Sequence, residues 1–89
     1  MDAEKTWTVR VVIDEHEDRT RAVARLDAGG AQSLAASGLA RLHPADRDVP
    51  RIGDELAVAR ALSDLAHLLI DATVNDIEAM THMPAHIEA

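Results

Sequence analysis

The spacing of apolar residues changes once along this chain, and that change limits the folds it can adopt more than any other feature. From Asp54 onward, apolar residues recur at intervals of three and four, at Val58, Leu62, Leu65, Ala66 and Leu69. This spacing places them on one face of an α-helix. Asp54 is the expected N-cap, and Glu55 falls in the first turn, where the helix dipole favours an anion. We therefore predict a long helix that begins at Asp54.

The first part of the chain has a period of two instead. Trp7, Val9, Val11 and Ile13 alternate along a run rich in β-branched residues, from Thr6 to Asp14. Such a run predicts a strand with one buried face. The charged residues 15–18 then predict the turn of a hairpin, because the segment is too short for a crossover.

Two further strands follow by the same reasoning. Arg19–Leu26 returns antiparallel, with Ala22, Ala24 and Leu26 on the inner face. Gly29-Gly30 marks a turn, and Ser33–His43 forms a third strand with Ala40 and Leu42 inward. Residues 34–36 are also compatible with a helical turn. The proline-containing connector 43–53 leads from the sheet to the helix.

The helical pattern slips at residues 72–74. Asn75, with Glu78 three residues later, resembles a capping box, so we predict a second, shorter helix with Ile77 and Met80 buried and its end at Pro84. The predicted fold class is α+β: a three-stranded antiparallel sheet followed by one long and one short C-terminal helix, packed on one face in the order β-β-β-α-α. Residues 1–89 form one domain, with an ordered core over about residues 6–83.

Length and composition point to association. A chain of 89 residues without cysteine has no disulfide to reinforce a small core, so a second subunit is the natural reinforcement. We expect a homodimer. The start of the chain has no apolar segment after a basic stretch, and no run of 18 apolar residues occurs, so we expect a cytoplasmic protein that does not enter a membrane.

Charge is distributed unevenly. The net charge is −7, and from Ala61 to the end there is no Lys or Arg, whereas residues 19–47 hold five arginines against Asp27 and Asp46. Trp7 is the only aromatic residue among Phe, Tyr and Trp. Stacking platforms for single-stranded bases are therefore missing, and the overall acidity opposes general nucleic-acid binding.

Catalytic signatures are absent from the sequence. The serines lack the glycine pattern of a strained nucleophile turn, and Gly29-Gly30 lacks the rest of a phosphate loop. His82 and His86 have the spacing of helical metal ligands, but Pro84 between them breaks the helix. His16 lies in a turn of carboxylates, which is more typical of a solvated hairpin tip than of an ion site. We expect no enzyme activity, no cofactor and no bound metal.

The outward face of the sheet is the most informative feature. It combines arginines with aliphatic residues, and we take it as the candidate partner or dimer surface: Arg10, Val12, Arg21, Val23, Arg25, Leu39 and Arg41. Arginine and apolar anchors are enriched at interfaces. Two alternatives are a solvent face on which arginine stems cover isolated valines, and a row of contacts to RNA phosphates.

Several stretches of this sequence resemble an actinobacterial family of small proteins of unknown function. The central ones are residues 43–50, which start with His43-Pro44-Ala45-Asp46-Arg47, and residues 52–56 and 58–65. Toward the ends they are Trp7-Thr8-Val9 with residues 13–17, and Asp76-Ile77-Glu78-Ala79 with residues 81–82, so the likeness spans about residues 7–84. The resemblance implies a double-stranded-RNA-binding-domain-like fold and a homodimer. It also implies a role in dormancy or stress physiology, and a fold similar to that of ribosome hibernation factors.

Three functional hypotheses follow. The first is a non-enzymatic, dimeric, stress-associated interaction protein, with the sheet face or an edge strand as the subunit contact. The alternative is a ribosome- or RNA-associated hibernation-type factor that uses Arg10, Arg21, Arg25 and Arg41 against phosphate. A small enzyme or a metal-binding protein is the residual alternative.

Overall fold

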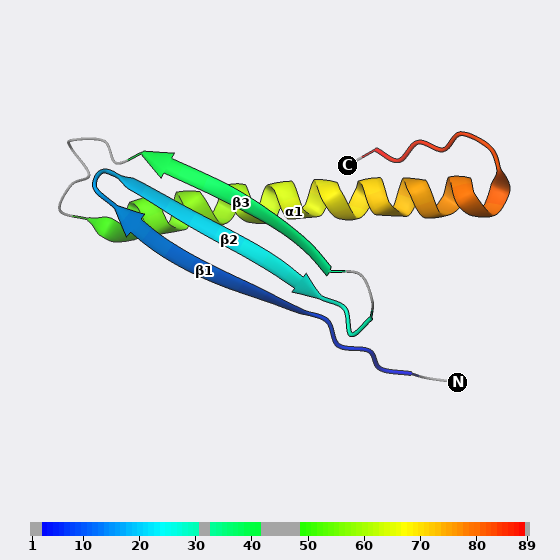
Figure 1. The fold of residues 1–89 in the computed structure, drawn as a ribbon, viewed down its shortest axis with the longest axis horizontal. Helices are drawn as coiled ribbons and strands as arrows, with labels where there is room; N and C mark the ends of the chain where they lie inside the picture. Colours follow the sequence, from blue (N-terminus) through cyan, green and yellow to red (C-terminus); the bar gives the residue numbers. More distant parts are fainter. Residues whose placement is uncertain (1–2, 31–32, 42–48, 89) are drawn as a thin grey trace.

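A sheet of three strands lies on one long helix in the computed structural model, which describes residues 3–30, 33–41 and 49–88 (Figure 1). The elements are β1 (Thr8–His16), β2 (Arg19–Asp27), β3 (Ser33–Arg41) and α1 (Pro50–Thr81). The sheet has the order β1-β2-β3, and both pairs are antiparallel. The predicted α+β class, with three antiparallel strands followed by a long helix, is confirmed.

The first turn is shorter than the predicted segment 15–18, because Glu15 and His16 belong to β1. Glu17 and Asp18 connect β1 to β2, and Glu17 has a φ of 57°, in the left-handed region. Gly29, with a φ of 71°, begins the second turn, and its N–H donates to Asp27 Oδ1 at 2.9 Å. Residues 34–36 belong to β3, so the strand interpretation of this segment is correct.

The helix is continuous, and the predicted break at residues 72–74 is wrong. Thr73 lies within it, and its hydroxyl donates to the Leu69 carbonyl at 2.8 Å, so its side chain is satisfied inside the helix. The helix also begins four residues before the predicted N-cap Asp54, since Pro50 has the φ that a first helical position requires. His82, with a φ of 58°, ends it in the left-handed conformation.

The core between sheet and helix is built mainly from alanine. The buried apolar residues are Ala22, Ala24, Leu26, Ala40, Ala57, Ala61 and Leu65. Small side chains let the two layers approach closely: a Cβ on Gly38 would overlap the Ala57 carbonyl oxygen. The predicted inner face of β2 is confirmed, as is the inward position of Ala40. Leu42 and connector residues 43–48 lie outside the described residues.

The buried stripe of α1 shares Leu65 with the predicted one, and the predicted Val58 and Leu69 are half-buried against the core, but its other residues differ. It consists of every fourth residue, Gly53, Ala57, Ala61 and Leu65. Such a row is inclined to the helix axis, which agrees with the oblique crossing of α1 under the strands in Figure 1. Leu62 and Ala66, which we predicted to be buried, are exposed, because the close contact needs small residues and takes place one residue earlier in each turn.

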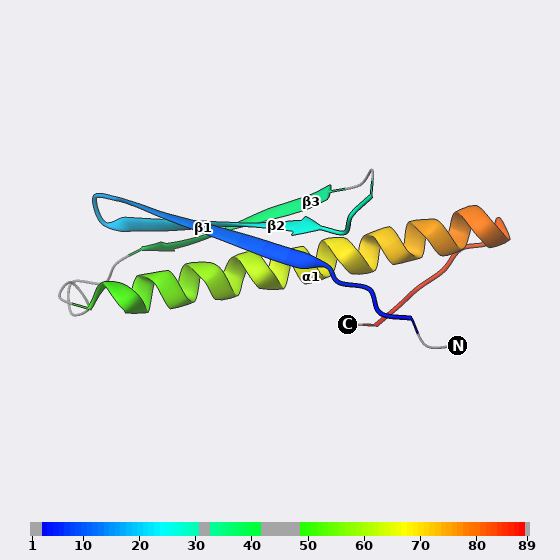
Figure 2. The ribbon, with the colours of Figure 1, turned by 90° about the horizontal axis from the view of Figure 1, so that it is seen from below.

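The molecule is longer than a compact domain of its size. Its radius of gyration is 16.8 Å, whereas about 12 Å is typical for this length. Beyond Leu65, α1 has no fully buried residue, and its C-terminal part continues past the sheet (Figure 2). Ile77 and Met80, predicted to be buried, are therefore exposed, Met80 by 82%.

Candidate interaction surfaces

All seven residues of the predicted partner surface lie on one face of the sheet, opposite α1. We call this the outer face. The strand register brings Arg10 beside Arg25, and Val12 beside Val23. It also brings Arg21 beside Leu39. The placement that the alternation predicts is thus confirmed, while the role of these residues in binding stays a prediction.

The outer face is the basic side of an acidic protein. Its strand residues include five arginines and two aspartates, which give a formal charge of +3. Since the net charge of the chain is −7, the remaining residues carry a net charge of −10. The fifth arginine is Arg19, which the prediction omitted although it is in phase with Arg21 and Arg25. Arg19 lies directly opposite Arg41, and His16 is its neighbour on β1.

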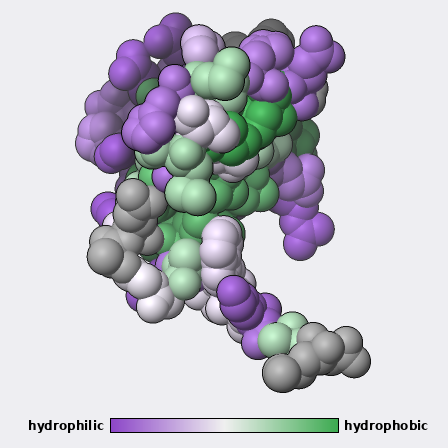
Figure 3. All heavy atoms as spheres, turned by 90° about the vertical axis from the view of Figure 1, so that its right-hand side faces the viewer, coloured by the Kyte–Doolittle hydropathy of each residue, from purple (hydrophilic) through white to green (hydrophobic). Residues whose placement is uncertain are grey.

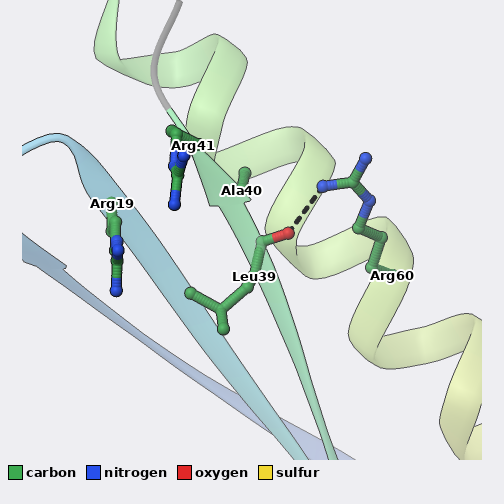
Figure 4. A pocket seen from close by; sticks show the side chains of 5 residues that line it. All are labelled: Arg19, Leu39, Ala40, Arg41 and Arg60. Atoms are coloured by element: carbon green, nitrogen blue, oxygen red, sulfur yellow. Dashed lines mark hydrogen bonds between the residues drawn. The ribbon is translucent and has the colours of Figure 1, made fainter.

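A hollow lies at the end of β3, beside the opposed pair Arg19 and Arg41. It has a volume of about 290 Å³ and is lined by Arg19, Leu39, Ala40, Arg41 and Arg60. Figure 4 shows Arg19 and Arg41 side by side on neighbouring strands, with Arg60 reaching from α1 on the other side of β3. The Arg60 guanidinium donates to the Leu39 carbonyl at 2.6 Å. Nothing in the sequence pattern places Arg60 here, because only the helix crossing brings it to β3.

The inner face of β1 is largely uncovered, contrary to the prediction of one buried face. Trp7, next to the strand, is 56% exposed, Val9 44% and Ile13 41%, and only Val11 is half-buried. The reason is the position of α1, which packs against β3 and β2 and hardly touches β1. Figure 3 shows hydrophobic surface open in the middle of the molecule between hydrophilic margins.

A groove of about 500 Å³ runs between β1 and α1. Ile13, Val58, Ala59 and Leu62 provide its apolar lining, together with the charged residues Arg51, Asp54 and Glu55. Asp54 Oδ1 is buried without a hydrogen-bond partner in the described part of the chain. We call this groove, together with Trp7 and Val9, which alternate in phase with Ile13, the β1 strip.

The edge of the sheet beside this strip is open. Within the residues that the structure describes, β1 pairs only with β2, so its other side is a free strand edge. The strand has nine residues and contains neither proline nor glycine. A long edge of this kind is a template for pairing with another strand.

The described residues contain neither a cluster of metal ligands nor a membrane-spanning helix. Among the described residues no group of three His, Cys, Asp or Glu side chains is close enough to hold a metal ion. His67 contacts the Ser63 carbonyl through Nδ1 at 2.9 Å, a local contact within the helix. In the described ranges, no helix has both the length and the apolar character needed to span a membrane.

Comparison with known proteins gives one consistent family. Residues 5–86 match the family described as Rv2632c-like. The protein Rv2632c of Mycobacterium tuberculosis is 59% identical over 80 residues, which cover 90% of this chain and 85% of that protein. Mb1767 of Mycobacterium bovis is 58% identical over 81 residues, 91% of this chain and 85% of that protein. Both are described as uncharacterised. The crystal structure of Rv2632c superposes with a TM-score of 0.83 at 54% identity, covering 93% of this chain and 98% of that one.

Proposed function

This chain belongs to the Rv2632c-like family, and we propose that it is a non-enzymatic interaction protein that acts as a homodimer. The subunit contact in this proposal is the β1 edge with the β1 strip. One observation carries it: apolar side chains on the inner face of β1 remain exposed beside a strand edge that pairs with no other described strand. The sequence left two contacts open, the sheet face and an edge strand, and this proposal takes the edge strand.

The energy of the isolated chain supports this proposal. Five of the seven buried apolar residues are alanines, so the core of one copy removes little apolar surface from water. Complete burial of a valine or isoleucine side chain contributes about 1.5–3 kcal/mol, and part of this gain is still missing at Val9 and Ile13, which are 44% and 41% exposed. In a twofold dimer each contact occurs twice, which doubles the gain.

The geometry of the strip favours a second copy as its occupant. Two β1 strands that pair antiparallel about a twofold axis would join two three-stranded sheets into one. Both β1 strips would then lie on the same side of the joined sheet and would bury each other. The outer face would stay free on the other side, with its arginines available to an acidic partner.

Adjacent residues of β1 provide a matched test. Ile13→Glu changes the β1 strip, and Val12→Glu changes the outer face; the wild-type side chains are 41% and 53% exposed. Both substitutions add the same charge to the same strand, so their effects on an isolated copy are similar. Light scattering over a range of concentrations measures the mass of each.

We expect a dimer for the wild type and for Val12→Glu, and a monomer for Ile13→Glu. A monomeric wild type at micromolar to millimolar concentration would overturn the proposal. Dissociation by Val12→Glu alone would instead assign the contact to the outer face, with Val23 and Leu39 as its other apolar residues.

A second candidate function is a ribosome- or RNA-associated factor of the hibernation type, with a double-stranded-RNA-binding-domain-like fold. The charge of +3 on the outer face favours it, since Arg10, Arg21, Arg25 and Arg41 are placed to meet phosphates. Cosedimentation with ribosomes should then weaken steeply as salt rises. Unchanged cosedimentation after glutamate replacement of these arginines would contradict this use of the face.

A role in dormancy or stress, in the cytoplasm, completes the proposal. This role is supported by the resemblance of residues 7–84 to the actinobacterial family, which implies dormancy or stress physiology. Deletion of the gene should reduce survival during oxygen limitation and leave aerobic growth unchanged. Equal survival of the deletion strain and its parent would remove this part of the proposal and leave the dimer untouched.

A further inference from the structure

The row of His16, Arg19 and Arg41 brings two cations together at one end of the outer face. Like charges directly opposite each other on neighbouring strands destabilise a sheet. The nearest carboxylate on this face, Asp14, lies in the next row and is opposite Arg21. Asp27, the other carboxylate of the face, is at the far end of β2.

A third guanidinium reaches the same place from another element. Arg60 lines the hollow from α1, and its hydrogen bond of 2.6 Å to the Leu39 carbonyl holds the group at the β3 edge. A guanidinium has five N–H donors. This contact uses one of its nitrogens, so the others can serve a ligand.

The described lining of the hollow is suited to a small anion. Leu39 and Ala40 also line it, and none of the described residues that line it is a carboxylate. Arg19 and Arg41 extend in parallel (Figure 4), and rotation about their side-chain torsions can bring both onto one group. Guanidinium groups bind tetrahedral oxyanions through paired hydrogen bonds.

We propose that the hollow lined by Arg19, Arg41 and Arg60 binds a phosphate group. The inference is independent of the proposed dimer, because β3 and β1 are opposite edges of the sheet. Phosphate chemistry is shared by free phosphorylated molecules and by the backbone of a nucleic acid. The two sources are distinguished by the experiment.

Arg10 and Arg25 offer the matched control. They also form a pair of arginines opposite each other on the outer face, but they do not line this hollow. Titration with pyrophosphate, followed by NMR of the backbone and arginine Nε–H signals, is compared for the wild type, Arg19→Gln, Arg41→Gln and Arg25→Gln. Far-UV circular dichroism checks that each variant is folded.

We expect saturable binding by the wild type and by Arg25→Gln, and about tenfold or greater weakening by Arg19→Gln and Arg41→Gln. In a parallel arm, a short RNA duplex replaces pyrophosphate. Binding of the duplex in competition with pyrophosphate identifies the source as a nucleic-acid backbone, and binding of pyrophosphate alone identifies a free phosphorylated molecule. Either result supports the site.

Two results would overturn it. One is the absence of saturable binding of both pyrophosphate and the duplex to the folded wild type. The other is equal weakening by Arg25→Gln and Arg41→Gln, which would show a general effect of charge on the outer face. Arg60→Gln adds a further check. Loss of the Arg60 guanidinium should weaken binding, and the charge of the sheet stays the same because Arg60 belongs to α1.

Discussion

The two edges of the sheet are treated differently by the fold. At β3, α1 lies against the strand, and Arg60 donates to the Leu39 carbonyl. At β1, the helix is almost out of contact, and the strand has no neighbour on its outer side in the described part of the chain. Proteins protect exposed edges because such edges pair with other chains. In the dimer that we propose, the second copy would pair with the β1 edge, whereas the β3 edge is already in contact with α1.

Side-chain size explains how the difference arises. Beneath β3 the contact residues are small, Gly38 and Ala40 facing Ala57 and Ala61, and this draws the helix close to that strand. The inner face of β1 carries larger residues, which the helix, held near β3, does not cover. The close packing of α1 against β3 therefore explains both the alanine-rich core and the exposed apolar side chains of β1.

We expect the largest loss of stability from a substitution at Gly38, where β3 and α1 are in closest contact. Gly38→Ala places a Cβ against the backbone of α1, at 2.5 Å from the Ala61 nitrogen, so the layers must separate. We expect a loss of about 3 kcal/mol in the free energy of unfolding, measured by urea denaturation. Gly30→Ala is the control, since its Cβ would meet no atom within 4 Å, and it should change stability by less than about 1 kcal/mol. Equal effects of the two would show that the close contact is unimportant.

A smaller effect is expected when the β3 edge is opened. Arg60→Met keeps most of the apolar stem but removes the donor to the Leu39 carbonyl. We expect a loss of about 1 kcal/mol in unfolding free energy and added association at high concentration. Arg10→Met, which removes the same charge from the outer face, should do neither. An unchanged Arg60→Met protein would mean that the helix alone protects this edge.

The smallest effect concerns the turn that attaches β1 to the sheet. Glu17 has a φ of 57°, which costs a residue with a Cβ about 1 kcal/mol. Glu17→Gly should therefore stabilise the fold by about 0.5–1 kcal/mol in thermal or urea unfolding while leaving the dimer affinity unchanged. Asp18 is outside the left-handed region, so Asp18→Gly should give no gain. A gain from Asp18→Gly alone would contradict this description of the turn.

Strand alternation was predictable because it follows from local geometry. Ala22, Ala24 and Leu26 share the inner face of β2 as the period of two requires, and this places Arg21, Val23 and Arg25 outside. The outer face could therefore be named from the sequence. What alternation could not give was burial: Val9 and Ile13 have the right phase, but whether a helix covers them depends on where α1 lies.

The helix was harder to predict because its contact face is small. The small residues of the contact face recur at intervals of four, at Gly53, Ala57, Ala61 and Leu65. The prediction instead followed the bulkier residues one position later, such as Val58 and Leu62. The apolar spacing does change at residues 72–74, but the helix continues, and the Thr73 hydroxyl donates to the Leu69 carbonyl. Arg60 entered the candidate phosphate site only through the helix crossing, which no local pattern encodes.

Hydrogen exchange at the two edges tests the central claim most directly. The amide groups of β1 that point away from β2 should become protected as protein concentration rises through the dimerisation range, because a second β1 would accept their hydrogen bonds. The amides of β3 should show no such dependence. Exchange at β1 that stays fast and independent of concentration, in a protein whose mass doubles, would show that the dimer forms elsewhere and would contradict the account.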